Sequence, residues 1–213
     1  MTATLPDSTN CYNEPGHTVS ERVSMEIWRK LLNRMMRASR LDSGFFEEME
    51  TEEDALAHAI MVALIVSAAT GIGMGLAALV GGAGALWFLW GLLSGFLASL
   101  AGWYAWVLIT FFCGTTFLRG PEKASLGELT RTLGLANSPG ILRILAFVPM
   151  FGWLILALSG IWTLASGVIA VKQTLEFNAG RAAATCILGW LVYMAALVLV
   201  YIWLPSPYKM LNF

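Results

Sequence analysis

The fold of this chain is decided by the stretch Asn137-Ser138-Pro139-Gly140-Ile141-Leu142-Arg143-Ile144, which Pro149 follows closely. Two prolines and an arginine lie here within a sequence that is apolar enough to enter a lipid bilayer. A broken backbone and a cation are tolerated in hydrocarbon only where protein or trapped water surrounds them. We therefore predict an interrupted segment that packs inside a bundle, with other apolar helices as its walls.

The composition is that of an integral membrane protein. Hydrophobic residues make up 57% of the 213 residues and charged residues only 13%, whereas about 25% of residues are charged in soluble domains. The second apolar run would exceed about 45 Å as a single helix, so we expect it to tilt, protrude or break near Gly102. The apolar runs are Ala55–Val80, Ala85–Leu118, Gly152–Val171 and Ala182–Trp203, and the two halves of the interrupted segment, Leu126–Ala136 and Ile141–Val148, lie between the second and the third.

The distribution of charge predicts the orientation in the membrane. The turn Gly81–Gly84 carries no charge, which is typical of the translocated side. If the interrupted segment crosses the bilayer, the cations in 119–131 and 172–181 stay on the cytoplasmic side with those of the N-terminal region. We therefore predict an all-α polytopic membrane bundle of about five transmembrane helices, the third interrupted, with a cytoplasmic N-terminus and an external C-terminus. The predicted parts are a flexible tail (1–19), a cytoplasmic amphipathic helix with an acidic linker (20–54), a transmembrane domain (55–204) and a short C-terminal tail (205–213).

The region before the first span combines a basic helix with an acidic run. From about Ser20 to Ser39, apolar residues recur at three- and four-residue spacing and basic residues occupy the other side. This pattern is typical of a helix that lies on an anionic membrane surface or on a protein surface. The acidic run 42–54 either neutralises this helix or docks a basic partner. The candidate contacts with the membrane surface or a partner are Trp28, Arg29, Lys30, Arg34, Arg37 and the two predicted interfacial anchors Phe45 and Phe46.

Small residues at four-residue spacing predict close helix packing. Gly71 and Gly75 share a face of the first span, and Gly91 and Gly95 share a face of the second run. Such pairs let two helix backbones approach each other in a membrane. We expect these four glycines to lie at helix contacts, and we expect Trp103 and Trp106 to pack inside the bundle.

The sequence has no recognisable catalytic constellation. It contains no His-Glu-x-x-His, no Gly-x-Ser-x-Gly and no phosphate-binding loop. Asp54 and His58, one helical turn apart, form either an interfacial hydrogen bond or a proton relay. Cys11, Cys113 and Cys186 form no Cys-x-x-Cys pair, and the latter two are expected to be small packing residues. We therefore predict no enzyme, no cofactor, no metal site and no nucleic-acid partner.

A series of short motifs occurs in a fixed order over about 37–201. They are Arg40-Leu41-Asp42, Phe45-Phe46-Glu47-Glu48, Gly134-Leu135-Ala136, Ser138-Pro139-Gly140-Ile141-Leu142-Arg143, Val148-Pro149-x-x-Gly152, Gly160-Ile161-Trp162, Ala170-Val171-x-Gln173-x-Leu175-x-Phe177 and Gly180-Arg181-Ala182. In these motifs the chain resembles the Yip family, the Ypt/Rab-interacting membrane proteins, in its bacterial form. The resemblance implies a five-helix membrane domain with a cytoplasmic N-terminus and with no known cofactor or enzymatic activity. Eukaryotic members that are tied to small GTPases carry an Asp-Leu-Tyr-Gly-Pro signature; this chain lacks it, which leaves GTPase binding open and favours a bacterial inner membrane.

Three functional hypotheses follow. In the first, the protein is a non-enzymatic membrane scaffold or accessory subunit that contacts lipids and recruits protein partners in the membrane or at its cytoplasmic face. In the second, it is a small transporter or channel with an anion site at Arg143, for which Glu128 or Glu176 is the resting partner. The third, a lipid-modifying enzyme that uses His58 with Asp54 and Arg143, ranks last. Arg143 alternatively locks the broken segment. The candidate functional residues are Arg143, Pro139, Gly140, Pro149, Glu128 and Arg181.

Overall fold

The computed structural model describes residues 19–117 and 125–203, and the described residues form helices and turns without a strand. Val19–Asn33 belongs to one compact unit, and the chain from Arg34 onward forms a second. The predicted tails at 1–19 and 205–213 lie outside the described residues, apart from Val19. The helices are α1 (Val19–Ser39), α2 (Ser43–Thr51), α3 (Ala55–Val80), α4 (Ala85–Phe112), the π-helix η1 (Cys113–Phe117), α5 (Leu126–Ala136), the 3₁₀-helix η2 (Ser138–Phe147), α6 (Gly152–Thr174) and α7 (Ala179–Trp203).

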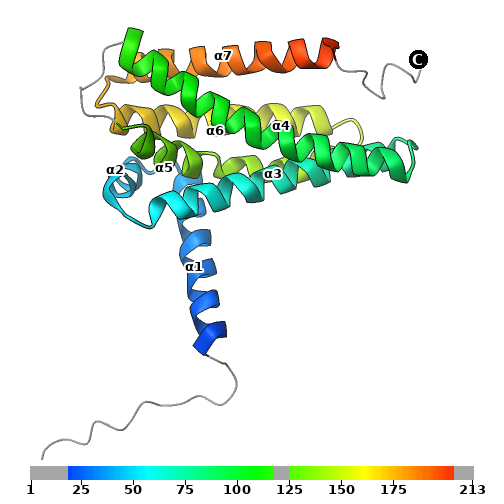
Figure 1. Ribbon diagram of the computed structural model, residues 1–213, viewed down its shortest axis with the longest axis horizontal. Coiled ribbons are helices and arrows are strands. Elements are labelled where there is room, and N and C mark those ends of the chain that lie inside the picture. The colour runs from blue at the N-terminus through cyan, green and yellow to red at the C-terminus, as the bar shows by residue number, and fades with distance from the viewer. Residues whose placement is uncertain (1–18, 118–124, 204–213) are drawn as a thin grey trace, which may run out of the picture. The chain divides into compact units, whose positions relative to one another are not determined.

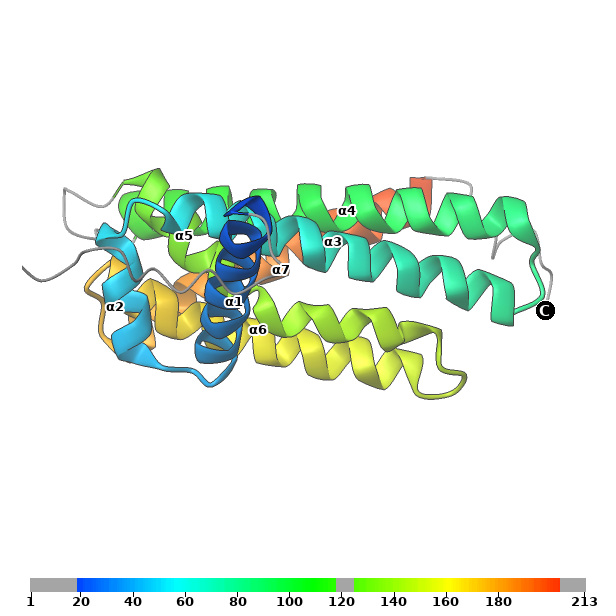
Figure 2. The same ribbon diagram turned by 90° about the horizontal axis from the view of Figure 1, so that it is seen from below.

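The second unit is a bundle whose long helices run side by side (Figures 1 and 2). Helices α3, α4 and α6 are each long and apolar enough to cross a membrane. The interrupted segment, α5 followed by η2, runs along α3 in the same direction, since Gly134 lies against Ala59 and Gly73 lies against the backbone of Arg143. The predicted membrane bundle with an interrupted third segment is therefore confirmed.

Helix α3 is the centre of the bundle because its glycines admit neighbours on two sides. A methyl group at Gly71 would overlap the carbonyl oxygen of Leu92, and one at Gly95 would lie 2.9 Å from the Cα atom of Gly71. Gly73 points to the other side, where a methyl group would overlap the carbonyl oxygen of Arg143. Gly75 and Gly91 continue the contact of α3 with α4. Because these glycines have no side chains, the backbone of α3 comes close enough to its neighbours for extensive van der Waals contact.

The structure differs from the sequence prediction in the second apolar run. Of the three alternatives for this run, the break near Gly102 is wrong, because α4 stays α-helical from Ala85 to Phe112, and tilting or protruding stays a prediction. A single glycine costs a helix only about 1 kcal/mol, which the packing of a buried residue easily offsets. The change in geometry comes later, where η1 adopts π-helical hydrogen bonding at Cys113–Phe117.

A second difference concerns the predicted acidic linker, which contains helix α2. The Asp42 carboxylate caps this helix by accepting a hydrogen bond of 3.3 Å from the backbone N–H of Phe45. Phe45, Phe46 and Met49 fall on one face of α2 and are buried. The many carboxylates of this segment obscured an amphipathic helix, whose apolar face needs only three residues.

Candidate functional site

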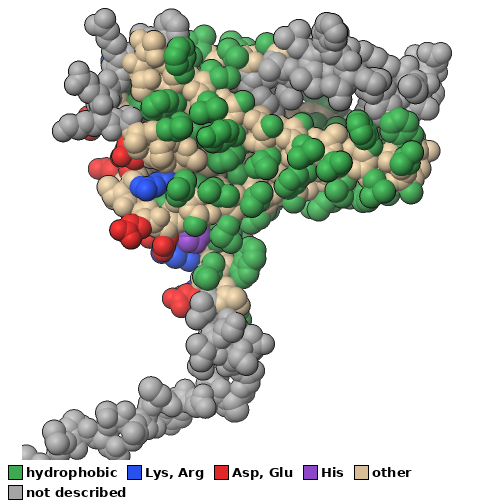
Figure 3. Space-filling view, in the orientation of Figure 1, with side chains coloured by type: hydrophobic (Ala, Val, Ile, Leu, Met, Phe, Trp, Pro, Cys, Tyr) green, Lys and Arg blue, Asp and Glu red, His purple; other side chains and the backbone are tan. Residues whose placement is uncertain are grey.

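The charged side chains of the second unit gather at one end of the bundle, which we call the charged cap (Figure 3). It comprises residues 34–54, the start of α5 at 125–131, and the turn between α6 and α7 at 172–181. In the described part of this unit, Arg143 is the one charged side chain outside the charged cap. The cap and the surroundings of Arg143 are therefore the two candidate sites.

Arg34 forms the buried part of the charged cap. Its side chain is only 5% exposed, and its Nη2 atom forms an ion pair with the carboxylate of Glu52. Its Nη1 atom lies 2.7 Å from His58 Nδ1, which also lies 2.8 Å from the backbone carbonyl oxygen of Asp54. Since a guanidinium only donates, Nδ1 accepts from Arg34 and cannot donate to that carbonyl at the same time. Arg34 thus ties the end of α1 to the start of α3.

Arg37 forms the exposed part of the same network. It donates hydrogen bonds to Glu48 at 2.9 Å and to Asp42 at 3.3 Å, and it stacks on the ring of Phe45. The hydrogen bond to Glu48 is the main cause that raises the pKa of Arg37, against a smaller lowering by burial. The interpretation that the basic helix and the acidic run neutralise each other is confirmed for these two arginines.

Three cap residues that the sequence suggests as surface contacts, Arg34, Phe45 and Phe46, are buried instead, whereas the surface role of the partly exposed Arg37 stays a prediction. Phe45 and Phe46 are fully buried against each other in an edge-on arrangement, because α2 turns its apolar face into the protein. Arg34 is buried with Glu52, and Arg37 is held by two carboxylates. Trp28, Arg29 and Lys30 belong to the other unit and are exposed there.

A depression of about 340 Å³ opens on the charged cap and is lined by Glu47, Glu50, Glu176 and Lys172 together with Gln173 and Phe177. Burial raises the pKa of the Glu50 carboxyl, with nearby carboxylates adding to the shift and a hydrogen bond from Thr174 opposing it. The backbone oxygen of Glu50 accepts a hydrogen bond of 2.8 Å from Arg131. The charged cap therefore has a hollow in which carboxylates outnumber cations, and Arg131 holds the backbone at Glu50.

The break in the interrupted segment lies where α5 ends and η2 begins. Asn137 and Ser138 are buried, and Pro139 occupies the first turn of η2, where its missing N–H costs no hydrogen bond. A methyl group at Gly140 would lie 2.7 Å from Val66 and 3.5 Å from the Arg143 guanidinium carbon. The absence of a side chain at Gly140 therefore lets the segment pack closely against Val66 of α3, and the Arg143 guanidinium lies next to Gly140.

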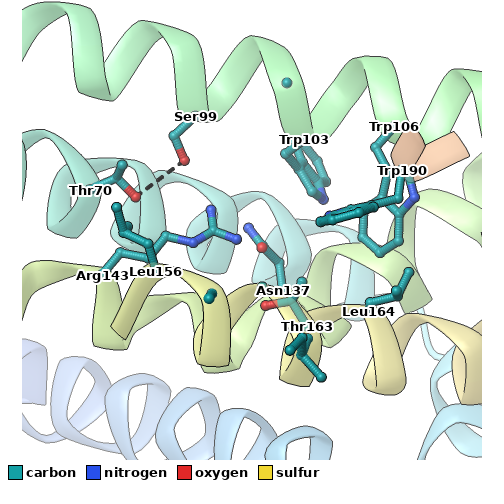
Figure 4. Close-up of a pocket in the computed structure, with 14 residues that line it drawn as sticks. Thr70, Ser99, Trp103, Trp106, Asn137, Arg143, Leu156, Thr163, Leu164 and Trp190 are labelled. Atoms are coloured by element: carbon teal, nitrogen blue, oxygen red, sulfur yellow. Dashed lines mark hydrogen bonds between the residues drawn. The ribbon is translucent and has the colours of Figure 1, made fainter. Parts of the chain in front are cut away.

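A cavity of about 510 Å³ lies beside this segment (Figure 4). Figure 4 shows the side chains of Arg143, Asn137 and Trp103 reaching into the same space from the interrupted segment and from α4. Polar groups line it from three sides: Asn137, Ser99 and Thr163 are each at least nine-tenths buried. The remaining lining residues are Thr70, Gly102, Trp106, Leu156, Ala157, Gly160, Ile161, Leu164 and Trp190.

Two buried polar atoms of this lining have no hydrogen-bond partner among the described residues. They are the indole Nε1 of Trp103 and the hydroxyl of Thr163. Thr70 and Ser99 in contrast share a hydrogen bond of 3.4 Å. Arg143 has an interaction of its own within the protein. The cavity thus has polar groups within a mainly apolar lining, and the donors of Trp103 and Thr163 have no partner among the described residues.

The structure separates the candidate residues Glu128 and Arg181 from Arg143. Glu128 closes a capping box with Ser125 at the start of α5, which places it about 14 Å along the helix from Asn137. Arg181 lies in the charged cap, where it stacks at 4.6 Å over the ring of Phe177. Pro149 is exposed in the turn after η2. The hypothesis that Glu128 is the resting partner of Arg143 therefore does not fit this arrangement.

Sequence reasoning missed most of the cavity. Trp103 and Trp106 were expected inside the bundle and are buried there, but nothing in their spacing joined them to Arg143. Thr163 and Asn137 carried a weak signal, since polar residues in an apolar span usually find an internal partner. No group of His, Cys, Asp and Glu in the described residues is arranged to hold a metal ion.

Comparison with known families shows a match over most of the chain. The family model described as the Yip1 domain matches residues 40–202, which includes the charged cap from Arg40 onward and the whole described bundle. The comparisons with curated proteins and with solved structures found no match.

Proposed function

This chain belongs to the Yip1 domain family, and on that premise we propose that it is a non-enzymatic accessory or scaffold protein of the bacterial inner membrane. The bundle anchors the protein in the lipid, and the charged cap recruits a protein partner. The observation that carries this proposal is the concentration of charge at one end of an otherwise apolar unit (Figure 3). A water-soluble partner would therefore meet the protein at the charged cap.

The orientation follows from the same observation. The described lysines and arginines of the second unit, except Arg143, lie in the charged cap, and the turn Gly81–Gly84 at the opposite end of α3 has no charge. Cations favour the cytoplasmic side of a bacterial inner membrane. We therefore place the charged cap in the cytoplasm.

The chemistry of the partner follows from the hollow of the charged cap. Glu47 and Glu176 are exposed at its edge, and Glu50 lies deeper. The burial that raises the Glu50 pKa reflects a carboxylate that would gain from an added cation. A lysine or arginine side chain of a partner would supply that cation.

Co-purification from native membranes without a crosslinker tests this proposal. The variant Glu47→Ala/Glu176→Ala removes two exposed charges, and Glu47→Asp/Glu176→Asp retains them as the matched control. We expect partners of the wild type and of the Asp variant, identified by mass spectrometry, to be depleted several-fold with the Ala variant. Isolation of the wild type as a partner-free monomer at native expression would contradict the proposal.

A second candidate function, transport of an anion, is favoured by the cavity beside the interrupted segment. Broken helices near the bilayer midplane often form substrate sites in transporters. Flux of a labelled anion into liposomes that contain the wild type or Arg143→Ala decides this question. Equal background leakage through both proteins would remove transport from consideration.

A further inference from the structure

We propose that the cavity beside Arg143 binds an anionic amphiphile, a carboxylate or phosphate group on a single hydrocarbon chain, which enters it from the bilayer. This inference does not rest on either proposed function, because a bound amphiphile can regulate a scaffold as well as be carried. Four features of the cavity support it: its unused donors, its charge, its apolar rim and its depth.

The unused donors show that the cavity is incomplete as it stands. Trp103 is 8% exposed and Thr163 is 5% exposed, yet neither Trp103 Nε1 nor Thr163 Oγ1 has a partner among the described residues. Leaving a buried polar group without a hydrogen bond costs about 1–3 kcal/mol. An indole N–H only donates, so the group that completes the cavity must offer an acceptor to Trp103.

The charge of the lining selects an anion. Arg143 contributes a guanidinium, and none of the other thirteen lining residues is an Asp or a Glu. A guanidinium matches the geometry of a carboxylate or a phosphate, with which it forms paired hydrogen bonds.

The rim of the cavity is apolar and faces the region that lipid chains would occupy. Leu156 and Ile161 of α6 line the cavity and are 37% and 63% exposed on the side of the bundle. Trp106, Trp190 and Leu164 extend the apolar surface inside. A molecule that arrives through this rim needs a hydrocarbon part, so a hydrated inorganic anion is a poor fit.

The depth and the size of the cavity agree with this ligand. Thr70 lies about 4 Å along α3 from the middle of that helix, so the polar lining is far from either aqueous phase. The volume of about 510 Å³ falls in the range of about 300–1,000 Å³ that is usual for small-molecule sites. A single-chain amphiphile fits such a space with its head group at Arg143.

Binding of radiolabelled dodecanoate to the full-length protein in a non-ionic detergent tests the inference. We expect saturable binding that unlabelled dodecyl phosphate displaces and that dodecanol, acetate and inorganic phosphate do not. Failure of dodecyl phosphate to compete would still support the site and restrict its ligand to carboxylates. Equal competition by dodecanol, competition by acetate or inorganic phosphate, or no saturable binding would overturn the proposal.

Variants of three cavity residues locate the binding. Arg143→Gln is expected to weaken binding about tenfold or more, as the loss of a charge-assisted hydrogen bond does. Gly160→Leu places a side chain in open space, since a methyl group there meets no atom within 4 Å, and should block the cavity without loss of thermal stability. Leu158→Phe, at an exposed α6 position outside the lining, is the matched control and should bind as the wild type does.

Thr163→Val separates a ligand-binding role from a structural one. The variant keeps the shape of the side chain but removes the unpartnered hydroxyl, so the empty protein should melt at the same or a higher temperature while binding weakens several-fold. Unchanged binding by both Gly160→Leu and Thr163→Val would show that dodecanoate sits elsewhere and would overturn the assignment.

Discussion

The surroundings of an arginine side chain differ between the charged cap and the cavity. In the cap, Arg34 is buried between Glu52 and His58, and each of these partners comes from a different part of the chain. In the cavity, Arg143 faces a lining without a carboxylate, next to donors that have no partner among the described residues. Arg34 is matched by groups of the protein and holds the fold together, whereas the unpartnered donors of Trp103 and Thr163 beside Arg143 point to a ligand from outside.

The largest expected effect concerns the contact on which the cavity depends. Gly73→Leu would drive a side chain into the backbone of Arg143 and Ile144, which should lower stability by about 3 kcal/mol or more. The loss of monodisperse protein on heating in detergent, measured by size-exclusion chromatography, checks this.

Gly160→Ala is the control for Gly73, because it adds a methyl group where the nearest atoms leave open space. Replacing a helical glycine by alanine at such a site should gain about 0.5–1 kcal/mol. If Gly73→Leu melts like the wild type, the close approach of α3 and η2 is not required, and the position of Arg143 loses its basis.

The next effect tests the difference between the two arginines directly. Arg34→Met should destabilise the protein by about 2 kcal/mol, less than the 3–5 kcal/mol of a fully buried pair because Glu52 is partly exposed. Arg143→Met should change the melting temperature less and should abolish the binding of dodecanoate. Arg40→Met, at an exposed position of the cap, controls for the loss of one charge. Equal destabilisation by Arg34→Met and Arg143→Met would erase the distinction.

The sequence predicts the apolar spans and the break between them better than it predicts the cavity, and the reason is physical. The spans Ala55–Val80 and Gly152–Val171 and the break at Ser138-Pro139-Gly140 follow from local composition, and the structure has α3, α6 and the start of η2 at these places. Local patterns suffice there because a bilayer requires about 20 apolar residues for each helix and because proline removes a backbone donor.

The cavity could not be predicted in this way. Its lining comes from α3, α4, the interrupted segment, α6 and α7, and a pattern within one helix does not say which neighbour it meets. Phe45 and Phe46 show the same limit at the charged cap. An aromatic pair among carboxylates is equally compatible with a membrane anchor and with buried core residues. Only the packing of α2 shows that Phe45 and Phe46 are core residues.

A smaller effect is expected from the titration of Glu50. Its pKa is raised, chiefly by burial, so the folded protein binds its proton more tightly than the unfolded chain does. Stability is then lost as the pH rises through the window above the usual value of 4.5 and is regained below it. Glu50→Gln should therefore melt at a higher temperature than the wild type at pH 7 and at a similar temperature at pH 4. The opposite order at pH 7 would show that the carboxylate already has a cation in the cap.

The smallest expected effect concerns Arg181. The sequence suggests it, like Arg143, as a candidate functional residue. Its guanidinium stacks over the ring of Phe177 at 4.6 Å and is exposed to solvent. Exposed pairs of this kind contribute about 0.5–1 kcal/mol, so Arg181→Gln should lower the melting temperature by only about 1–4 °C and should leave dodecanoate binding unchanged. Arg181→Lys, which keeps the charge but not the planar group, separates the stacking from simple electrostatics. A loss of binding with Arg181→Gln would mean that an exposed cation of the cap acts on the cavity, and the two regions could then no longer be treated as independent.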